Sequence, residues 1–410
     1  MEYLKLHNFG PISDLDIALK KVNIFIGEQG VGKSTLAKLL SCCRDFVLYY
    51  VIVHNMGEKL IKQIFSTYGI HTYFKEDTYI EYYDSDGIKL NYKNNRFSLS
   101  HTTYDETKII KYIDQLVIHG VETAYGKLIG AIGGLTQEDV DNILKDNSRI
   151  IFSNLRTSFY CPAERGIAGV LSNSLATLLL SETPLPQPLI EYMSFFEKAR
   201  KEYTSFDIPF MHLKYSYEDG KNLVKVDNDS VQLQYASSGI QSILPLLMVI
   251  EYCLQKNYFS SFTIEEPELN LFPTNQFHLL QTLIAKTNHE KSKLGSWTLT
   301  THSPYLLSVF NISLLAGRIA EKFPEYIEEL KELISPSYVI YSDEIAVYEL
   351  RLNKSDGKCC VSILDEATGL IKGNYLDSIS DIISSDFNRL YKLYVRLTRE
   401  MKRKDDRASS

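Results

Sequence analysis

Gly27-Glu-Gln-Gly-Val-Gly32-Lys33-Ser34 is a complete G-x-x-x-x-G-K-[ST] pattern near the beginning of a chain of 410 residues. The apolar stretch Val22–Ile26 precedes it and the apolar stretch Ser34–Leu40 follows it, so the sequence predicts strand, loop and helix in succession. Glycines let consecutive backbone N–H groups point inward around phosphate oxygens, and the helix that follows adds its positive end. The alternative is a glycine-rich turn that binds nothing, and the flanking strand and helix argue against it. We therefore expect an α/β protein that binds a nucleotide.

The residues of this phosphate loop (27–34) have distinct expected roles. Lys33 would contact the β- and γ-phosphates of ATP, and the Ser34 hydroxyl would bind Mg²⁺. The other nucleotide-binding residues expected here are Gly27, Gly30, Gly32 and Thr35.

A phosphate loop of this kind needs an acidic residue at the end of a neighbouring buried strand, to hold Mg²⁺ through water. The strand-like stretch Ser261–Ile264 is followed by Glu265 and Glu266. Glu265 would face the metal, and Glu266, which points to the other side, would polarise the attacking water. The alternative is an acidic turn after a strand. Lys33 and Glu265 are 232 residues apart (265 − 33), which implies an insertion between them.

Two further segments carry candidate site residues. Ser237-Ser238-Gly239 stands at the start of a helical stretch, where hydroxyls, backbone N–H groups and the helix dipole can bind an anion. A simple helix N-cap is the alternative there. His302 follows the strand-like stretch Trp297–Thr301, and a histidine at such a position can contact a γ-phosphate rather than serve structure alone.

These four segments, in this order, resemble the ATP-binding-cassette (ABC) type of P-loop ATPase, in the branch with the SMC proteins, RecF and the OLD-family ATPases. The segments are GEQGVGKST, SSGIQS, IEEPELNLFP and TTHSPYLL. The resemblance implies an ABC-ATPase head: a mixed P-loop sheet with an antiparallel β subdomain, split by a largely helical insertion. Glu265 replaces the aspartate of transporter cassettes, and Ser-Ser-Gly replaces Ser-Gly-Gly.

The resemblance also implies a dimeric mechanism with ATP and Mg²⁺ as cofactors. ATP bound to one head would be covered by Ser238 and Gly239 of a second head, and hydrolysis would use Glu266 and His302. The loop that crosses the interface would contain Asn270 and Leu271. Cassettes carry a glutamine loop at the place where this chain has Glu164 and Arg165, so that role has no clear equivalent.

A narrower resemblance rests on Asn8–Ile12, Pro162–Arg165 and Tyr375–Asp381. These stretches look like those of the stand-alone ATPase subunits of bacterial antiphage systems such as PARIS and Septu. This resemblance implies a homodimer or higher homo-oligomer that senses, scaffolds or regulates a separate effector protein.

Four regions are expected along the chain: an N-terminal part of the head at 1–41, an inserted helical and hairpin region at 42–156, a C-terminal part of the head at 157–335, and a small α/β extension at 336–410 that ends in a basic helix. The insertion has helical patterns at Glu58–Ser66, Asp105–His119 and Thr136–Leu144, and a hairpin at Thr78–Tyr92.

Composition excludes several classes of protein. Apolar residues make up 44% and the net charge is −7, so a packed core is expected and wholesale disorder is excluded. No apolar stretch reaches the roughly 18 residues of a membrane span, and six cysteines without a C-x-x-C motif indicate neither a disulfide framework nor a zinc site. We expect a reduced, cytoplasmic protein with no membrane partner. Residues 389–407 hold eight basic and three acidic side chains, a balance of +5 against −12 elsewhere, so nucleic acid stays open as a partner.

Three functions remain open on the sequence alone. The first is an ATPase that regulates a separate effector, and the second is a RecF- or SMC-like DNA-binding ATPase in repair or maintenance. The SMC form requires long heptad stretches, which are absent. The third is an OLD-type nuclease, which the sequence disfavours because no acidic cluster on buried strands follows His302. We favour the first.

Overall fold

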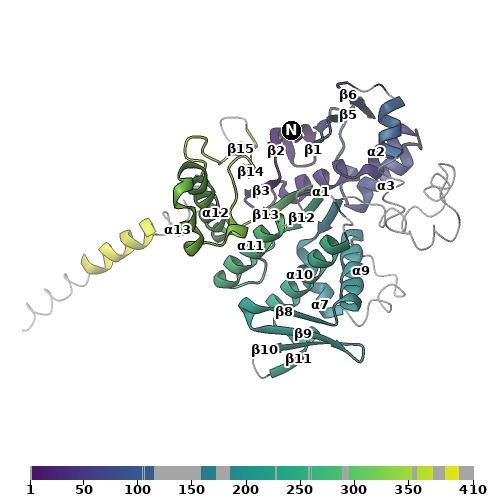
Figure 1. Cartoon of the computed structure of the whole chain (residues 1–410). Helices are drawn as coiled ribbons and strands as arrows, with labels where there is room; N and C mark the ends of the chain where they lie inside the picture. The colour runs from purple at the N-terminus through teal and green to yellow at the C-terminus, as the bar shows by residue number, and fades with distance from the viewer. Residues whose placement is uncertain are drawn as a thin grey trace, which may run out of the picture.

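The computed structural model describes most of the chain (Figure 1), namely residues 2–103, 105, 107–114, 158–171, 185–226, 229–256, 259, 261–288, 295–352, 358–372 and 384–396. The predicted helix at Thr136–Leu144 lies outside these residues, as does the end of the one predicted at Asp105–His119, of which 107–114 are helical.

A six-stranded sheet forms the centre of the molecule, in the order β15-β14-β3-β13-β12-β7. All neighbours are parallel except β14 and β15. In register, Ile24 of β3 is level with Leu299 of β13, which is level with Ile264 of β12. The carboxyl ends of these three strands therefore meet at one edge of the sheet. The strands are β3 Val22–Gly27, β7 Ser158–Cys161, β12 Ser261–Glu265, β13 Ser296–Thr301, β14 Ile345–Leu350 and β15 Cys360–Ser362.

Side chains of β3 alternate between two hydrophobic cores, as expected for a strand buried on both faces. Ile24 belongs to the core that includes α9, α10, α11 and α12, whereas Phe25 belongs to the core that includes α1. The expected α/β head is therefore what the chain forms. The helices are α1 Lys33–Cys43, α9 Gln187–Glu202, α10 Ser238–Lys256, α11 Pro273–Asn288 and α12 Pro304–Lys322.

A second, antiparallel sheet of five strands has the order β2-β1-β4-β5-β6. Because β4 pairs with β1, the hairpin predicted at 78–92 extends the sheet that the first 19 residues begin. The strands are β1 Glu2–Phe9, β2 Ile12–Leu19, β4 Tyr79–Tyr83, β5 Ile88–Lys93 and β6 Arg96–His101. Helices α2 Phe46–Val53 and α3 Glu58–Thr67 and the short helix η1 His71–Tyr73 connect α1 to this sheet. The domain boundaries given above stay predictions.

A third sheet, of four antiparallel strands in the order β11-β10-β9-β8, lies beyond α10 in Figure 1. Its strands are β8 Ser205–Ile208, β9 Leu213–Glu218, β10 Lys221–Val226 and β11 Asp229–Gln232. The short helices η3 Pro209–Met211 and η4 Leu233–Tyr235 flank it. The short helices η2 Ala163–Gly166 and α7 Ile167–Leu171 follow β7.

The C-terminal part of the chain returns to the central sheet. Strand β14, which follows η6 Pro324–Tyr326, α13 Ile327–Leu333 and η7 Pro336–Tyr338, pairs with β3 along its whole length. The region at 336–410 thus contributes a central strand to the head. The described part of the expected basic helix is helical at 384–396, and residues 397–410 lie outside the described range.

Helix α10 is long and apolar enough, by length and composition alone, to cross a membrane. Within the fold, however, 72% of its apolar window is buried. Leu246 and Val249, for example, are fully buried in the core beside the central sheet. This burial is the pattern of a core helix of the head.

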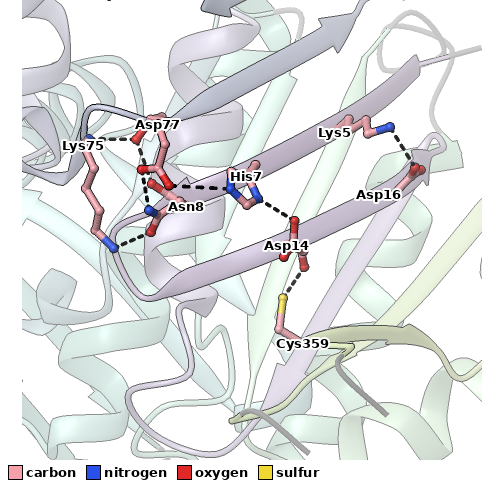
Figure 2. A network of polar contacts seen from close by, with 9 residues as sticks. Lys5, His7, Asn8, Asp14, Asp16, Lys75, Asp77 and Cys359 are labelled. Carbon is pink, nitrogen blue, oxygen red and sulfur yellow. Dashed lines mark hydrogen bonds and ion pairs between the residues drawn. The ribbon is translucent and has the colours of Figure 1, made fainter.

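Polar contacts fix the turn between β1 and β2 (Figure 2). His7 Nδ1 lies 2.7 Å from Asp14 Oδ1, and His7 Nε2 lies 3.7 Å from Asp77 Oδ2. The hydrogen bond with Asp14 raises the pKa of His7, and the negative charges of Asp14 and Asp77 raise it further. Asn8 donates to Asp77 and accepts from Lys75, whose Nζ also donates to the Gly10 carbonyl. The turn that follows Asn8 is thereby tied to residues 75–77, and this turn contacts the phosphate loop.

Candidate nucleotide-binding site

The phosphate loop runs from the end of β3 into α1 in a backbone conformation that requires glycine. Gly30 has φ 79° and Gly32 has φ 103°, both in the left-handed region. A Cβ on Gly32 would lie 2.9 Å from Cγ1 of Ile12, and one on Gly27 would lie 2.3 Å from the Leu350 carbonyl oxygen. The phosphate loop therefore packs closely against the β1–β2 turn and against the end of β14.

Lys33 is the first residue of α1, and its side chain is folded back over the phosphate loop. Its Nζ donates to the carbonyl oxygen of Gly27 at 2.8 Å and to that of Glu28 at 2.7 Å. Burial lowers the pKa of Lys33 to about 8, although three nearby carboxylates oppose the shift. Those carboxylates belong to Glu266, Glu265 and Glu268. These residues follow or end β12, whose carboxyl end lies at the same edge of the central sheet as the end of β3 and the phosphate loop.

Glu265 ends β12, a strand that is buried along its whole length. Its side chain is 5% exposed, and Oε1 has no hydrogen-bond partner among the described residues. On α1, Ser34 is exposed at the first turn, while the hydroxyl of Ser41 donates to that of Thr263 and ties α1 to β12. A buried carboxylate oxygen without a partner and a hydroxyl at the loop fit a Mg²⁺ ion, which keeps several waters and substrate oxygens in its shell. The described residues contain no group of three or more His, Cys, Asp or Glu that could hold a metal by itself.

Glu266 and His302, the two predicted catalytic residues, lie side by side. Glu266 Oε1 is 3.4 Å from His302 Nε2, and each side chain is 29% exposed. Burial lowers the pKa of His302, with the charge of Lys33 adding to the shift and Glu266 opposing it. Burial and the charge of Lys33 both favour the neutral form of the imidazole.

Glu268 is a site residue that the sequence analysis did not single out. It is 8% exposed, and its Oε1 accepts from the Thr301 hydroxyl at 2.6 Å and from the His302 backbone N–H at 3.1 Å. Glu268 thus fixes the end of β13 and, with it, the position of His302. The available signal was a third acid two residues after Glu266, which a count of carboxylates at the strand end would have included.

Ser237, Ser238 and Gly239 lie at the beginning of α10. Both serines are exposed, whereas Gly239 is buried, and a Cβ on Gly239 would lie 2.8 Å from the Asn270 carbonyl oxygen. No hydrogen bond among the described residues joins these serines to the phosphate loop.

The segment after β7, which contains Glu164 and Arg165, contacts both the acidic turn and α10. The Arg165 guanidinium donates to main-chain carbonyls after β12. Four residues further, a Cβ on Gly169 would lie 2.9 Å from the Gln241 carbonyl oxygen on α10. The main chains of α7 and α10 therefore pack closely, and the segment connects the end of β12 with the helix that carries Ser238.

Three comparisons with known proteins extend this description. Residues 71–307 match a family model described as AAA ATPase domain, a range that begins after the phosphate loop and includes Glu265, Glu266 and His302. No curated protein matches the chain.

Several solved structures are similar to the chain. The SMC head domain from Thermotoga maritima is 11% identical at a TM-score of 0.39, with 88% of this chain and 98% of that chain covered. The Smc head domain with an extended coiled coil bound to the C-terminal domain of ScpA, from Pyrococcus furiosus, is 12% identical at a TM-score of 0.39, with 94% and 99% covered. An SmcHead bound to the C-winged helix domain of ScpA is 11% identical at 0.37, with 90% and 99% covered. Because the family model covers more than half of the 410 residues, the chain belongs to the AAA ATPase domain family.

Proposed function

We propose that this protein binds ATP with Mg²⁺ and hydrolyses it in a site that two paired copies complete. The observation that carries the proposal is the contact between Glu266 and His302 at the sheet edge where Lys33 and the phosphate loop also lie. A carboxylate beside a neutral imidazole, next to a lysine that is held among main-chain carbonyls, suits transfer of a phosphoryl group to water.

Each residue has a chemical role in this proposal. The backbone N–H groups of the phosphate loop and the Nζ of Lys33 bind the β- and γ-phosphates. Ser34 and Glu265 would hold Mg²⁺, which when bound neutralises charge on the phosphate oxygens. The Glu266 carboxylate orients the attacking water and accepts its proton, while the His302 ring contacts the γ-phosphate.

The low pKa of Lys33 gives the proposal a pH dependence. Bound phosphates stabilise the ammonium and raise its pKa above the value of about 8 in the free protein. Below that pH the lysine is protonated in both states and ATP affinity is constant; above it, binding takes up a proton and the affinity falls by about tenfold per pH unit. ATP does not titrate there, because terminal phosphates ionise near pH 6.

Calorimetric titration with ATP between about pH 7 and pH 9.5 measures this dependence. Lys38→Gln, a change on the same helix, should leave the profile as it is in the wild type. An affinity that stays flat across the range would show that ATP binding is not coupled to protonation of Lys33 there, and Lys33→Ala then decides whether Lys33 binds the phosphates.

Pairing of two copies is supported by what surrounds the exposed serines of α10. Three aromatic side chains are largely exposed: Tyr235 at 72% in η4, just before these serines, Phe272 at 73% on the loop after β12, and Tyr305 at 53% in the first turn of α12. Exposed aromatic residues are enriched at the centres of protein–protein interfaces. In the proposed pair, Ser237 and Ser238 would contact the nucleotide of the second copy.

Ser238→Arg tests the pairing. The arginine adds bulk and charge at the surface that would cover the nucleotide, so turnover of ATP should fall by about 100-fold while ATP affinity changes less than about twofold. Phosphate release and calorimetric titration measure the two quantities. The matched control is Ser230→Arg, an exposed serine of β11, which should behave as the wild type. Unchanged turnover in Ser238→Arg would exclude this surface, and a wild-type protein that releases no phosphate would exclude hydrolysis altogether.

Regulation of a separate effector in antiphage defence stays a prediction from the resemblance, as does DNA maintenance. One described feature favours contact with nucleic acid as the second candidate: Arg389, Lys392 and Arg396 are exposed along the helix at 384–396.

A further inference from the structure

Arg165 lies in η2, directly after the edge strand β7, and its side chain is fully buried. The guanidinium is surrounded by main-chain carbonyl oxygens. Its NH1 donates to the oxygen of Glu265 at 2.6 Å, and its NH2 donates to those of Glu266 at 2.6 Å and Pro267 at 3.1 Å. Three consecutive carbonyls of the segment Glu265–Pro267, here called the catalytic turn, thus share one cation.

The catalytic turn has a backbone conformation that needs such support. Glu266 has φ 42°, in the left-handed region that residues with a side chain rarely adopt. Its N–H still extends the sheet by donating to the Thr300 carbonyl at 2.9 Å, whereas its own carbonyl points to Arg165. The chain therefore reverses at Glu266 itself, and this reversal sets the direction of the Glu266 side chain.

We propose that Arg165 is a positioning residue for the reaction. By holding the carbonyls of the catalytic turn it keeps Glu266 in the left-handed conformation that aims its carboxylate at the site beside His302. Arg165 acts only through the main chain of Glu266. The inference rests on the proposed function for its catalytic consequence, whereas the main-chain clamp exists without ATP.

The chemistry of the guanidinium explains why arginine is needed. Its planar fork carries five donors and can span several acceptors at once, whereas the ammonium of lysine is a point charge on a flexible stem. Arg165→Lys keeps the charge, but one nitrogen must then replace the two guanidinium nitrogens that hold the Glu265 carbonyl and the Glu266 and Pro267 carbonyls. The catalytic turn would then be free to relax toward an ordinary backbone conformation, and the Glu266 carboxylate would move away from the site.

Arg165→Lys is compared with Arg200→Lys, the substitution of another buried arginine. Arg200 is 9% exposed, lies on α9, and packs 5.1 Å from the ring of Tyr217. Both changes remove a buried guanidinium, but only the first touches the catalytic turn. If Arg165→Lys yields no folded protein, Arg165→Gln replaces it, because the neutral amide keeps two donors.

The first measurement is amide hydrogen exchange in the nucleotide-free protein. The N–H groups of Glu266 and Leu269, which donate to Thr300 and Glu266 carbonyls, should exchange at least tenfold faster in Arg165→Lys. Arg200→Lys should leave them unchanged. Unchanged exchange in Arg165→Lys would refute the clamp, whether or not the protein hydrolyses ATP.

The second measurement is steady-state ATP turnover. Because displacement of a reacting group by about 1 Å can cost about 100-fold in rate, kcat should fall by that factor in Arg165→Lys while KM stays within about threefold. In single turnovers of Glu266→Gln protein, adding Arg165→Lys should cause no further loss, since Arg165 acts through Glu266. Three outcomes would each overturn the positioning role. In the first, amide exchange is faster in Arg165→Lys but kcat stays at the wild-type value; in the second, kcat falls equally in Arg200→Lys. In the third, the double variant loses single-turnover rate by the full factor that Arg165→Lys causes alone. An inactive wild-type protein would instead count against the proposed function.

Discussion

Glu266→Gln is expected to lower the rate of ATP hydrolysis by at least about 100-fold and to leave ATP affinity within about twofold of the wild type. The amide has the shape of the carboxylate and can still contact the imidazole 3.4 Å away, so the catalytic turn keeps its conformation. It cannot accept a proton from water. If two copies pair over ATP as proposed, the variant should bind ATP, pair, and remain paired, because ATP that is not hydrolysed stays between the copies.

Phosphate release, ATP titration and sedimentation with and without ATP measure the three properties of this variant. Glu328→Gln, a change of an exposed glutamate on α13, is the control and should match the wild type in all of them. Hydrolysis at the wild-type rate in Glu266→Gln would remove Glu266 from the role of the base. Loss of ATP binding would show instead that the carboxylate supports the nucleotide pocket.

Local patterns predicted the parts of the site that depend on consecutive residues. The phosphate loop is continuous in the sequence, and its strand and helix were expected at nearly their observed bounds. Glu265 ends a short buried strand, Glu266 follows it, and His302 follows another, and the carboxyl ends of parallel strands meet at one edge of a sheet. Their convergence therefore follows from the fold class.

Contacts with the main chain could not be predicted in the same way. Arg165 donates to carbonyl oxygens, and every residue has a carbonyl, so nothing in the sequence marks its partners. The same holds for the packing of Gly169 against Gln241. These contacts depend on which segments lie side by side, as does the place of β14 beside β3, more than 300 residues away in sequence.

Two elements have sequences that do not by themselves indicate the structure they form. Phe46–Val53 is apolar throughout, so it has no periodicity to assign it, yet it forms α2 with Asp45 as its N-cap. The stretch Val231–Tyr235 has strand-like composition, but β11 ends at Gln232 and η4 follows. The carbonyls of Leu233 and Gln234 accept from the Gln241 side chain, which stabilises this bend at the entry to α10.

Lys33→Ala is expected to lower ATP affinity by at least about 100-fold, the size of a lost charge-assisted hydrogen bond to phosphate together with the loss of an opposing charge. Lys33 is the cation on which Glu265, Glu266 and Glu268 act. Without it, ATP would bring its negative charge to a site that already holds three carboxylates. Thermal unfolding with and without ATP measures the effect, since a ligand at about 100 times its Kd stabilises the folded state by about 2.7 kcal/mol.

The wild-type protein and Lys38→Ala, a change on the same helix, should both be stabilised by ATP, whereas Lys33→Ala should not. Without ATP, Lys33→Ala should unfold close to the wild-type temperature, because removal of a partly desolvated ammonium offsets the loss of its two hydrogen bonds with the loop. The variants Glu266→Gln and Lys33→Ala should therefore have opposite effects on pairing. Glu266→Gln should accumulate ATP-dependent pairs and Lys33→Ala should form none, and pairs in Lys33→Ala that are equal to those of Glu266→Gln would mean that the copies associate without the nucleotide between them.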